Sequence, residues 1–217
     1  SGGIDSPVAG WLMKRKLSLL AVHFSFEPLT DNEPELKSRK LAALLGIQNF
    51  FVINISKELK ELAEKCDRKY YFVLMKRLMF RRAEVLASRE GCSFLVTGES
   101  LGQVSSQTLE NLFAIDAAVE IPVLRPLISK DKEEIVKIAE QIGSFELSKG
   151  KEVCDVLGPD HPSTRARIGD ILRQEALLKD ADAKENVDSS FHTEAIENLL
   201  PPQEIHCFFW PIPTSST

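Results

Sequence analysis

The chain begins with a loop whose residues have the chemistry to bind a polyphosphate, Ser1-Gly2-Gly3-Ile4-Asp5-Ser6. Gly2 and Gly3 have no side chains, so the backbone can turn several N–H groups toward one anion. The helix predicted after the loop adds the positive end of its dipole at the same place. Ser1 and Ser6 can donate hydroxyl hydrogen bonds to phosphate oxygens, and Asp5 can either hold Mg²⁺ or position a donor amide. The pattern predicts a phosphate-binding loop, although such residues also form ordinary helix-capping turns.

Other polar residues stand where a bound nucleotide would meet them. Gly98, between Thr97 and Glu99, follows a predicted strand, and ligands of open α/β sheets bind at the carboxyl ends of strands. A glycine there lets a flat base or a ribose approach the backbone. His23 also ends a predicted strand, and Lys132 offers a positive charge that can stabilise a reacting phosphate. Taken alone, these residues are better explained as a structural turn, a packed histidine and a solvated lysine.

Cys154 is the cysteine whose surroundings best suit sulfur chemistry. It lies in a segment punctuated by Gly150, Gly158, Pro159 and Pro162, which predicts a loop and an accessible thiol. The thiolate is the reactive form of cysteine, although most free cysteines are buried and inert. The four cysteines of the chain are widely spaced with no CxxC pair, so we expect reduced thiols and no metal site.

Alternating strands and helices must position these residues. Short apolar runs rich in β-branched and aromatic residues predict strands at 17–24, 49–55, 93–97 and 121–127. Helical patterns are predicted at 8–16, 33–45, 57–66, 69–89 and 130–142. Gly46, Gly91 and Gly143 stand where helices end, and Asp131 with Glu134 resembles a capping box. This alternation predicts an α/β fold with a mainly parallel sheet.

The two ends of the chain depart from the alternation. No strand precedes the loop at Ser1, although a strand normally leads into such a loop, so we expect the first strand to be missing from a chain cut from a longer protein. After residue 163 the pattern predicts two helices and then a proline-rich extended segment, at 164–179, 192–200 and 201–213. The predicted division is an α/β domain, residues 1–165, followed by a helical and extended appendage, residues 166–217.

Composition limits the partners of the chain. The chain has 217 residues, of which 43% are hydrophobic, so it can bury a substantial core. Its net charge of -5 gives no overall attraction to nucleic acid, so any RNA contact must be local. No apolar run is long enough to cross a bilayer and no signal peptide is visible, so we expect a cytoplasmic protein without membrane association.

The hexapeptide, continued by Pro7-Val8-Ala9, resembles the SGGxDS motif of the PP-loop ATP pyrophosphatases. Within that superfamily the chain is similar to the tRNA 4-thiouridine synthetases of the thiamine-biosynthesis type. Besides the loop, three ordered blocks over roughly residues 1–165 carry this resemblance: Thr97–Thr108, Leu124–Ile128 with Asp131-Lys132, and Cys154 followed by Pro159, Pro162 and Thr164. The resemblance implies a three-layer sandwich of the adenine-nucleotide α-hydrolase type.

The resemblance also implies roles for individual residues. Asp5 and Lys132 would be the catalytic pair for phosphate chemistry, and Cys154 would carry sulfur as a persulfide. Lys76 or Arg77 would be a basic nucleotide contact, and the sequence does not decide between them. The full set of implied ATP contacts is Ser1, Gly2, Gly3, Asp5, Ser6, His23, Phe24, Lys76, Arg77, Gly98 and Gln107.

The implied reaction is ATP-dependent thiolation of a tRNA uridine with Mg²⁺, by adenylation of the base, release of pyrophosphate and transfer of sulfur. A role in forming the thiazole of thiamine is implied too. The expected partners are tRNA, a persulfide donor such as a cysteine desulfurase, and a second copy in a homodimer. Two departures stand out: the RNA-binding region of the family is absent, and Val153 precedes Cys154 where many relatives have two adjacent cysteines. The alternatives are a PP-loop ligase acting on a small molecule and a nucleotide-binding domain without turnover.

Overall fold

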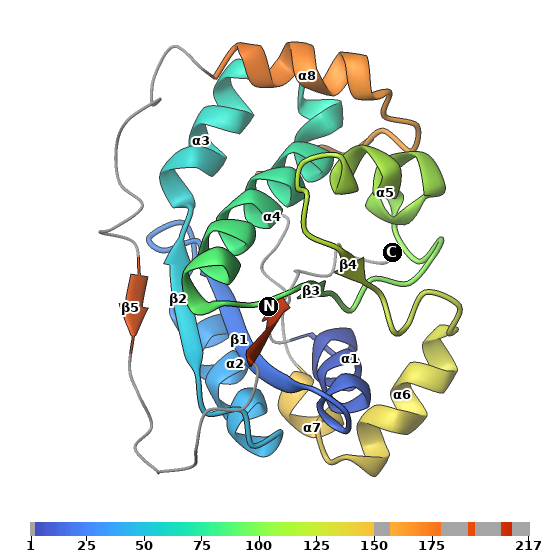
Figure 1. The fold of residues 1–217 in the computed structure, drawn as a ribbon. Coiled ribbons are helices and arrows are strands. Elements are labelled where there is room, and N and C mark those ends of the chain that lie inside the picture. The colour runs from blue at the N-terminus through green and yellow to red at the C-terminus, as the bar shows by residue number, and fades with distance from the viewer. Residues whose placement is uncertain (1–2, 150–156, 179–190, 194–204, 210–217) are drawn as a thin grey trace.

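The computed structural model describes residues 3–149, 157–178, 191–193 and 205–209, the last two ranges as backbone strands (Figure 1). The helices are α1 (Asp5–Lys14), α2 (Glu33–Leu44), α3 (Ser56–Lys65), α4 (Tyr71–Glu90), α5 (Leu109–Asp116), α6 (Lys132–Gln141), α7 (Phe145–Ser148) and α8 (Ile168–Ala176). Short 3-10 helices cover Arg68–Tyr70 and Ser105–Gln107. The strands are β1 (Ser18–Ser25), β2 (Phe50–Asn54), β3 (Leu95–Val96), β4 (Val123–Leu124), β5 (Phe191–Thr193) and β6 (Ile205–Phe209).

The strands form one mainly parallel arrangement. The larger sheet has the order β5-β2-β1-β6, and β3 pairs with β4 in a second, two-stranded parallel sheet. β1 runs parallel to both neighbours, with Ala21 opposite Phe50 of β2 and Ser18 opposite Ile205 of β6. β3 contacts β6, so the two sheets adjoin there. The order of crossovers reverses between β1 and β3, which is where ligands bind in such sheets.

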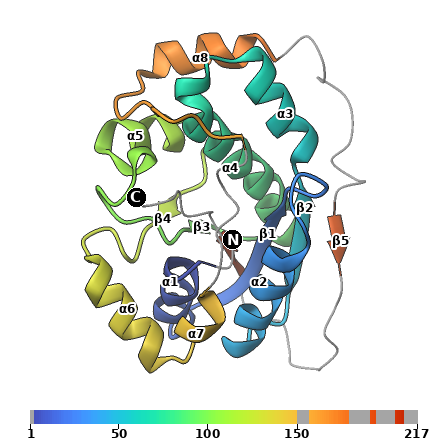
Figure 2. The ribbon, with the colours of Figure 1, turned by 180° about the vertical axis from the view of Figure 1, so that it is seen from behind.

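Two layers of helices cover the sheet, as seen from both sides in Figures 1 and 2. The alternation of side chains along β1 decides which residue faces which layer. Leu20 and Val22 pack in the core formed with α3, α4, α5 and α8, whereas Ala21 packs in the core formed with α1, α2 and α6. The predicted three-layer α/β sandwich is therefore confirmed.

Most predicted elements are present with shifts of a few residues at their ends. Gly46, Gly91 and Gly143 have positive φ angles of 66°, 71° and 73° directly after helices, as expected of glycine at a helix C-terminus. The capping box of Asp131 and Glu134 is formed in both directions. The sequence patterns missed α5 and α7, which have eight and four residues.

The C-terminal part of the chain differs from expectation. The helix predicted at 192–200 is wrong at its start, because Phe191–Thr193 form β5 and pair antiparallel with β2. The edge of β2 offers backbone hydrogen-bond partners to this segment, whereas a short isolated helix is only marginally stable. Residues 194–200 lie outside the described residues. β6 is an extended strand, as predicted for 201–213, and it occupies the place beside β1 on the side of β3.

α8 is attached to the α/β layers. It covers Ile168–Ala176, shorter than the predicted 164–179, and its buried Ile171 belongs to the core around α4. The division at residue 165 stays a prediction. None of the helices in the described ranges has the length and apolar character needed to cross a membrane.

Candidate active site

The predicted phosphate loop leads directly into α1. Ile4 takes the N-cap position, and its side chain forms no capping hydrogen bond. The positive end of the helix dipole at this N-terminus favours an anion. Asp5 is half-buried in the first turn, and Ser6 beside it is buried. Gly3 is buried as well, whereas Ser1 and Gly2 lie outside the described residues. We call residues 3–6, at the N-terminus of α1, the anion cradle, after the role that the sequence predicts for them.

Gly98 joins the end of β3 to this cradle. A Cβ atom at Gly98 would lie 2.7 Å from the Ser6 nitrogen and 2.8 Å from the Asp5 carbonyl carbon. Both distances are shorter than real Cβ contacts, so only glycine allows the strand end to pack on the first turn of α1. The sequence predicts that the space at Gly98 serves a base or a ribose. In the structure the backbone of the loop itself lies against Gly98.

The segment after Gly98 also reaches the start of α6. The Ser100 hydroxyl donates to the Lys130 carbonyl at 2.7 Å, and the Leu101 N–H donates to the Ile128 carbonyl at 3.1 Å. Lys132 is the first residue of α6, and its side chain is exposed. The segment 98–101 therefore connects the helices that carry Asp5 and Lys132.

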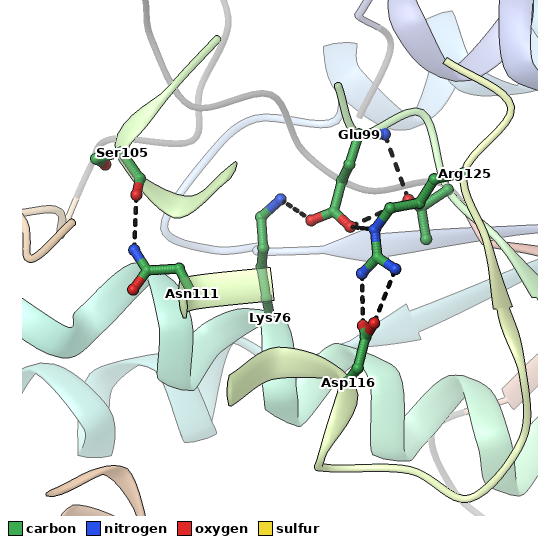
Figure 3. Close-up of polar contacts among 7 residues, drawn as sticks. Lys76, Glu99, Ser105, Asn111, Asp116 and Arg125 are labelled. Atoms are coloured by element: carbon green, nitrogen blue, oxygen red, sulfur yellow. Dashed lines mark hydrogen bonds and ion pairs between the residues drawn. The ribbon is translucent and has the colours of Figure 1, made fainter. Parts of the chain in front are cut away.

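A buried row of alternating charges lies at the same strand end (Figure 3). The Lys76 ammonium, 1% exposed on α4, donates to Glu99 Oε1 at 2.6 Å. Glu99 Oε2 accepts from Arg125 Nε at 2.8 Å and from the Thr97 hydroxyl at 3.1 Å. The Arg125 guanidinium then binds both oxygens of Asp116, at 2.9 and 2.5 Å. We call Lys76, Glu99, Arg125 and Asp116 the charge row.

The charge row keeps its central carboxylate ionised. Burial acts to raise the pKa of Glu99, but the charges and hydrogen bonds of Lys76 and Arg125 outweigh it, and the pKa is lowered. Across the described residues, Glu99 is the one acceptor that Lys76 reaches. An ammonium has three donors, so Lys76 retains capacity for a further acceptor.

Arg77, the neighbour of Lys76 on α4, faces a different part of the molecule. Its Nε and Nη2 bind the two oxygens of Glu175 on α8 at 2.8 and 3.0 Å, and its Nη1 donates to the Ala114 carbonyl. Arg81 adds a further hydrogen bond to Glu175 at 2.7 Å. Arg77 thus ties α4 to α5 and α8.

His23 and Phe24 lie at the carboxyl end of β1, as predicted. The Ser38 hydroxyl donates to the Pro34 carbonyl at 2.8 Å and lies 3.0 Å from His23 Nδ1. Because a hydroxyl has one proton, His23 Nδ1 carries the hydrogen of this second bond, and Nε2 is the acceptor nitrogen. Burial, with the charge of Arg39 adding to it, lowers the pKa of His23 well below 6.5, so the ring is neutral.

Phe24 contributes its side chain to the core rather than to a site. Its ring is buried on the α4 face of the sheet. His23, Phe24 and Ser25 pair with Val52, Ile53 and Asn54 of β2. The Phe24 ring is thus part of the core, and only the backbone of this residue is left for a contact with a ligand.

Gln107 lies in a segment rich in unsatisfied polar atoms. Within the described part of the chain, the buried side-chain nitrogen and oxygen atoms without a hydrogen-bond partner are Gln103 Nε2, Ser106 Oγ and Gln107 Oε1. Each such atom costs roughly 1–3 kcal/mol in a folded protein. Asn111, which is fully buried, fixes this segment by donating to the Ser105 carbonyl (Figure 3). It also donates to the Ser163 carbonyl. A segment with buried donors and acceptors that have no protein partner is suited to a polar ligand.

Cys154 lies outside the described residues, and hydrogen bonds hold the chain on either side of it. The Ser148 hydroxyl donates to the Gly3 carbonyl at 3.3 Å. On the far side, Arg68 donates to the carbonyls of Leu157 and Gly158 at 3.0 and 3.1 Å.

The other cysteines give a mixed result. Cys66 is a free and buried thiol, and burial, aided by the charge of Glu175, raises its pKa. Such a thiol is inert at neutral pH. Cys92 is disulfide-bonded, so the expectation of reduced thiols is wrong there. In the described ranges no group of three metal-ligating side chains gathers.

Comparison with known proteins identifies the family. The model of the family described as thiamine biosynthesis protein (ThiI) matches residues 1–179. The chain belongs to this family. It is 40% identical over 206 residues to the probable tRNA sulfurtransferase of Alkaliphilus metalliredigens, covering 92% of the chain and 52% of the relative. It is 41% identical over 201 residues to that of Brevibacillus brevis, covering 87% and 50%.

A solved structure of the same type supports the fold. The crystal structure of a 4-thiouridine synthetase–RNA complex with bound ATP matches with a TM-score of 0.77 and 33% identity, over 91% of this chain and 54% of that chain. The chain spans about half the length of the curated ThiI-family relatives it matches.

The structure brings together some of the predicted residues and adds others. Asp5, Ser6, Gly98 and Lys76 are connected through the segment 98–101, while Arg77 is directed to α8. Four further residues, Glu99, Arg125, Asp116 and Asn111, were not predicted as site residues from the sequence. Glu99 and Arg125 lie inside motif blocks already noted, and that was the available signal.

Proposed function

We propose that this chain is the ATP-activating part of a tRNA sulfurtransferase. It would adenylate a uridine, release pyrophosphate and allow sulfur to replace the activated oxygen. One observation carries the proposal: the segment 98–101 brings the N-terminus of α1, the buried Lys76 and the start of α6 with Lys132 to one strand end. Relatives named as tRNA sulfurtransferases and a neighbour with bound ATP support it.

The phosphates of ATP would bind at the start of α1. Backbone N–H groups of the loop Ser1–Gly3, the Ser6 hydroxyl and the helix dipole favour negative charge there. A Mg²⁺ ion usually binds substrate phosphates with one or two carboxylates, and Asp5 is the carboxylate of this turn. Lys132 would stabilise the charge that develops as pyrophosphate leaves.

The nucleoside of ATP would be held by groups at the ends of β1 and β3. Lys76 has donor capacity left, whereas the donors of Arg77 are used within the protein, so we infer that Lys76 is the basic contact. Neutral His23 would accept through Nε2, and Phe24 would act through its backbone. The vacant atoms of the segment 103–107, including Gln107 Oε1, are suited to the polar edge of a base.

Cys154 would supply the sulfur as a persulfide. The uridine O4 would attack the α-phosphorus, and the terminal sulfur of the persulfide would then attack C4 and expel AMP. The disulfide left between that sulfur and Cys154 would be cleaved by a further thiol. Cys154 is six residues from Ser148, so the length of the chain keeps it within roughly 20 Å of the Gly3 loop.

The partners follow from this chemistry. The net charge is -5, and the chain covers about half of the length of its relatives. We therefore expect tRNA to bind mainly through a region outside this chain. A cysteine desulfurase or similar donor would load Cys154, and the same chemistry could feed thiamine thiazole formation. A cytoplasmic site of action and a homodimer remain part of the proposal.

Pyrophosphate release tests the proposal. With ATP, Mg²⁺ and unmodified tRNA, Asp5→Asn and Lys132→Met should each lower the rate by about 100-fold or more, because both act on the reacting phosphates. Lys137→Met, also exposed on α6, is the matched control and should keep the wild-type rate. Equal rates for the Lys132 and Lys137 variants would contradict the proposal. Release without tRNA but with a small-molecule acceptor would indicate a ligase, and ATP binding without release would indicate a domain without turnover.

A further inference from the structure

Glu99 is the most constrained charged residue at the site. Its side chain is 1% exposed, and both of its oxygens are used. Oε1 takes the Lys76 ammonium, while Oε2 takes Arg125 and Thr97. Burying a carboxylate to this extent costs desolvation free energy, which only well-placed hydrogen bonds and opposite charges can offset. Glu99 follows Gly98, whose backbone lies against the anion cradle.

The outer half of the charge row fixes the direction of this carboxylate. Arg125 binds Asp116 through both terminal nitrogens and Glu99 through Nε, a planar fork that allows little rotation. The Thr97 hydroxyl holds the same oxygen, Oε2. Oε1 is thereby turned toward α4 and Lys76, as Figure 3 shows.

Lys76 receives its direction from Glu99 alone within the described residues. A lysine side chain has four rotatable bonds and populates many rotamers when no contact fixes it. Here the 2.6 Å contact with Glu99 Oε1 selects one position and leaves two of the three N–H donors for another acceptor. An incoming polyphosphate or ribose oxygen would be that acceptor.

We propose that Glu99 is a positioning residue, which holds the Lys76 ammonium in the orientation that binds ATP and is itself oriented by Arg125 and Asp116. It would not touch the nucleotide. Preorganisation of this kind lowers the entropy that binding would otherwise cost. The inference rests on the proposed function, since it needs ATP at this strand end.

A double-mutant cycle on ATP affinity tests the role of Glu99. The full chain is titrated with MgATP by calorimetry as wild type, Glu99→Gln, Lys76→Met and the double variant. Glu99→Gln and Lys76→Met should each raise the Kd for ATP by about 10- to 100-fold. The double variant should bind as weakly as Lys76→Met alone, because Glu99 acts through Lys76. If Glu99 had only a structural role, the fold-changes in Kd of the two single variants would instead multiply in the double variant.

Two further measurements keep the test decisive. If Glu99→Gln does not fold, Glu99→Asp keeps the charge but withdraws the carboxylate from Lys76, and it should weaken ATP binding only while Lys76 is present. In turnover, Glu99→Gln should raise KM for ATP far more than it lowers kcat. Lys65→Met, an exposed lysine paired with Glu61, controls for loss of a charge and should leave the Kd unchanged.

The possible failures are distinct. Multiplied effects in the cycle, or wild-type ATP affinity in Glu99→Gln, would overturn the role of Glu99 and leave the proposed function standing. A wild-type chain that does not bind MgATP would overturn both.

Discussion

Lys76 and Arg77 are adjacent on α4, carry the same charge and are both 1% exposed, yet their surroundings differ. Arg77 has acceptors on Glu175 and Ala114 for each of its three nitrogens. Lys76 has one acceptor, Glu99, among the described residues. The first arrangement connects helices, and the second leaves donors available beside an anion cradle.

The difference shows how two buried cations can be told apart. A buried charge must have a partner of opposite charge or a hydrogen-bond acceptor, because burying an unpaired charge costs too much free energy. The number of N–H donors without an acceptor indicates whether the protein alone satisfies the cation or whether a ligand can still bind it. On that measure Arg77 stabilises the fold, and Lys76 is the residue of this pair that we propose as a substrate contact.

The largest effect on stability is expected at Arg77. Arg77→Met leaves Glu175 buried with Arg81 alone, whose side chain is 43% exposed. Breaking a buried ion pair costs about 3–5 kcal/mol, which urea unfolding would measure. Arg89→Met is the control, because that side chain is 42% exposed and its pair with Glu90 contributes at most about 1 kcal/mol. Weaker ATP binding by folded Arg77→Met, rather than lower stability, would reverse the assignment.

The converse result is expected at Lys76. Lys76→Met should weaken ATP binding by about 10- to 100-fold, because a buried charge contact to the nucleotide is lost. Its unfolding free energy should fall less than that of Arg77→Met, since Glu99 keeps Arg125 and Thr97 as partners. Calorimetry with MgATP and urea unfolding of the same samples compare the two variants. A large stability loss with unchanged Kd would place Lys76 with Arg77.

The sequence could predict elements but could not assign these neighbours. The runs behind β1 and β2 are continuous and apolar, so periodicity and length were enough to find them. α5 was missed because it is short and leaves Leu109 and Phe113 exposed, so it has no clear apolar face.

The site depended on distant partners. Whether residue 76 or residue 77 faces the strand end is decided by Glu99 and Glu175, which lie 23 and 98 residues further along the chain. Local patterns contain no information on such pairs. Gly98 was noted for its position, but its contact with α1 required the packing of β3 on that helix.

Acid should weaken the α4–α8 connection. Burial acts to raise the pKa of Glu175, but the hydrogen bonds of Arg77 and Arg81 outweigh it and lower the pKa below the ordinary 4.5. A lowered folded-state pKa contributes stability above the unfolded value, and this stability is lost as the pH falls through the folded value. The unfolding free energy should thus decrease below pH 4.5, and less steeply in Glu175→Gln. An identical pH dependence in both proteins would contradict the ion pair.

The smallest effect is expected at the outer end of the charge row. Asp116 is 42% exposed, and its pair with Arg125 is partly screened by solvent. Asp116→Asn should lower stability by no more than about 1 kcal/mol, and it should raise the Kd for ATP less than Glu99→Gln does. Calorimetry on both variants ranks them. An Asp116→Asn effect as large as that of Glu99→Gln would mean that the row acts as one unit.

Gly98 has a consequence for mutational scanning. Its φ angle is ordinary, so no backbone rule marks the position, yet any side chain would collide with the first turn of α1. In a scan scored on product formation, every substitution at Gly98 should score as inactive, as substitutions of a catalytic acid do. Functional maps built from such scores would give this residue a chemical role, although it contributes only the absence of one carbon atom.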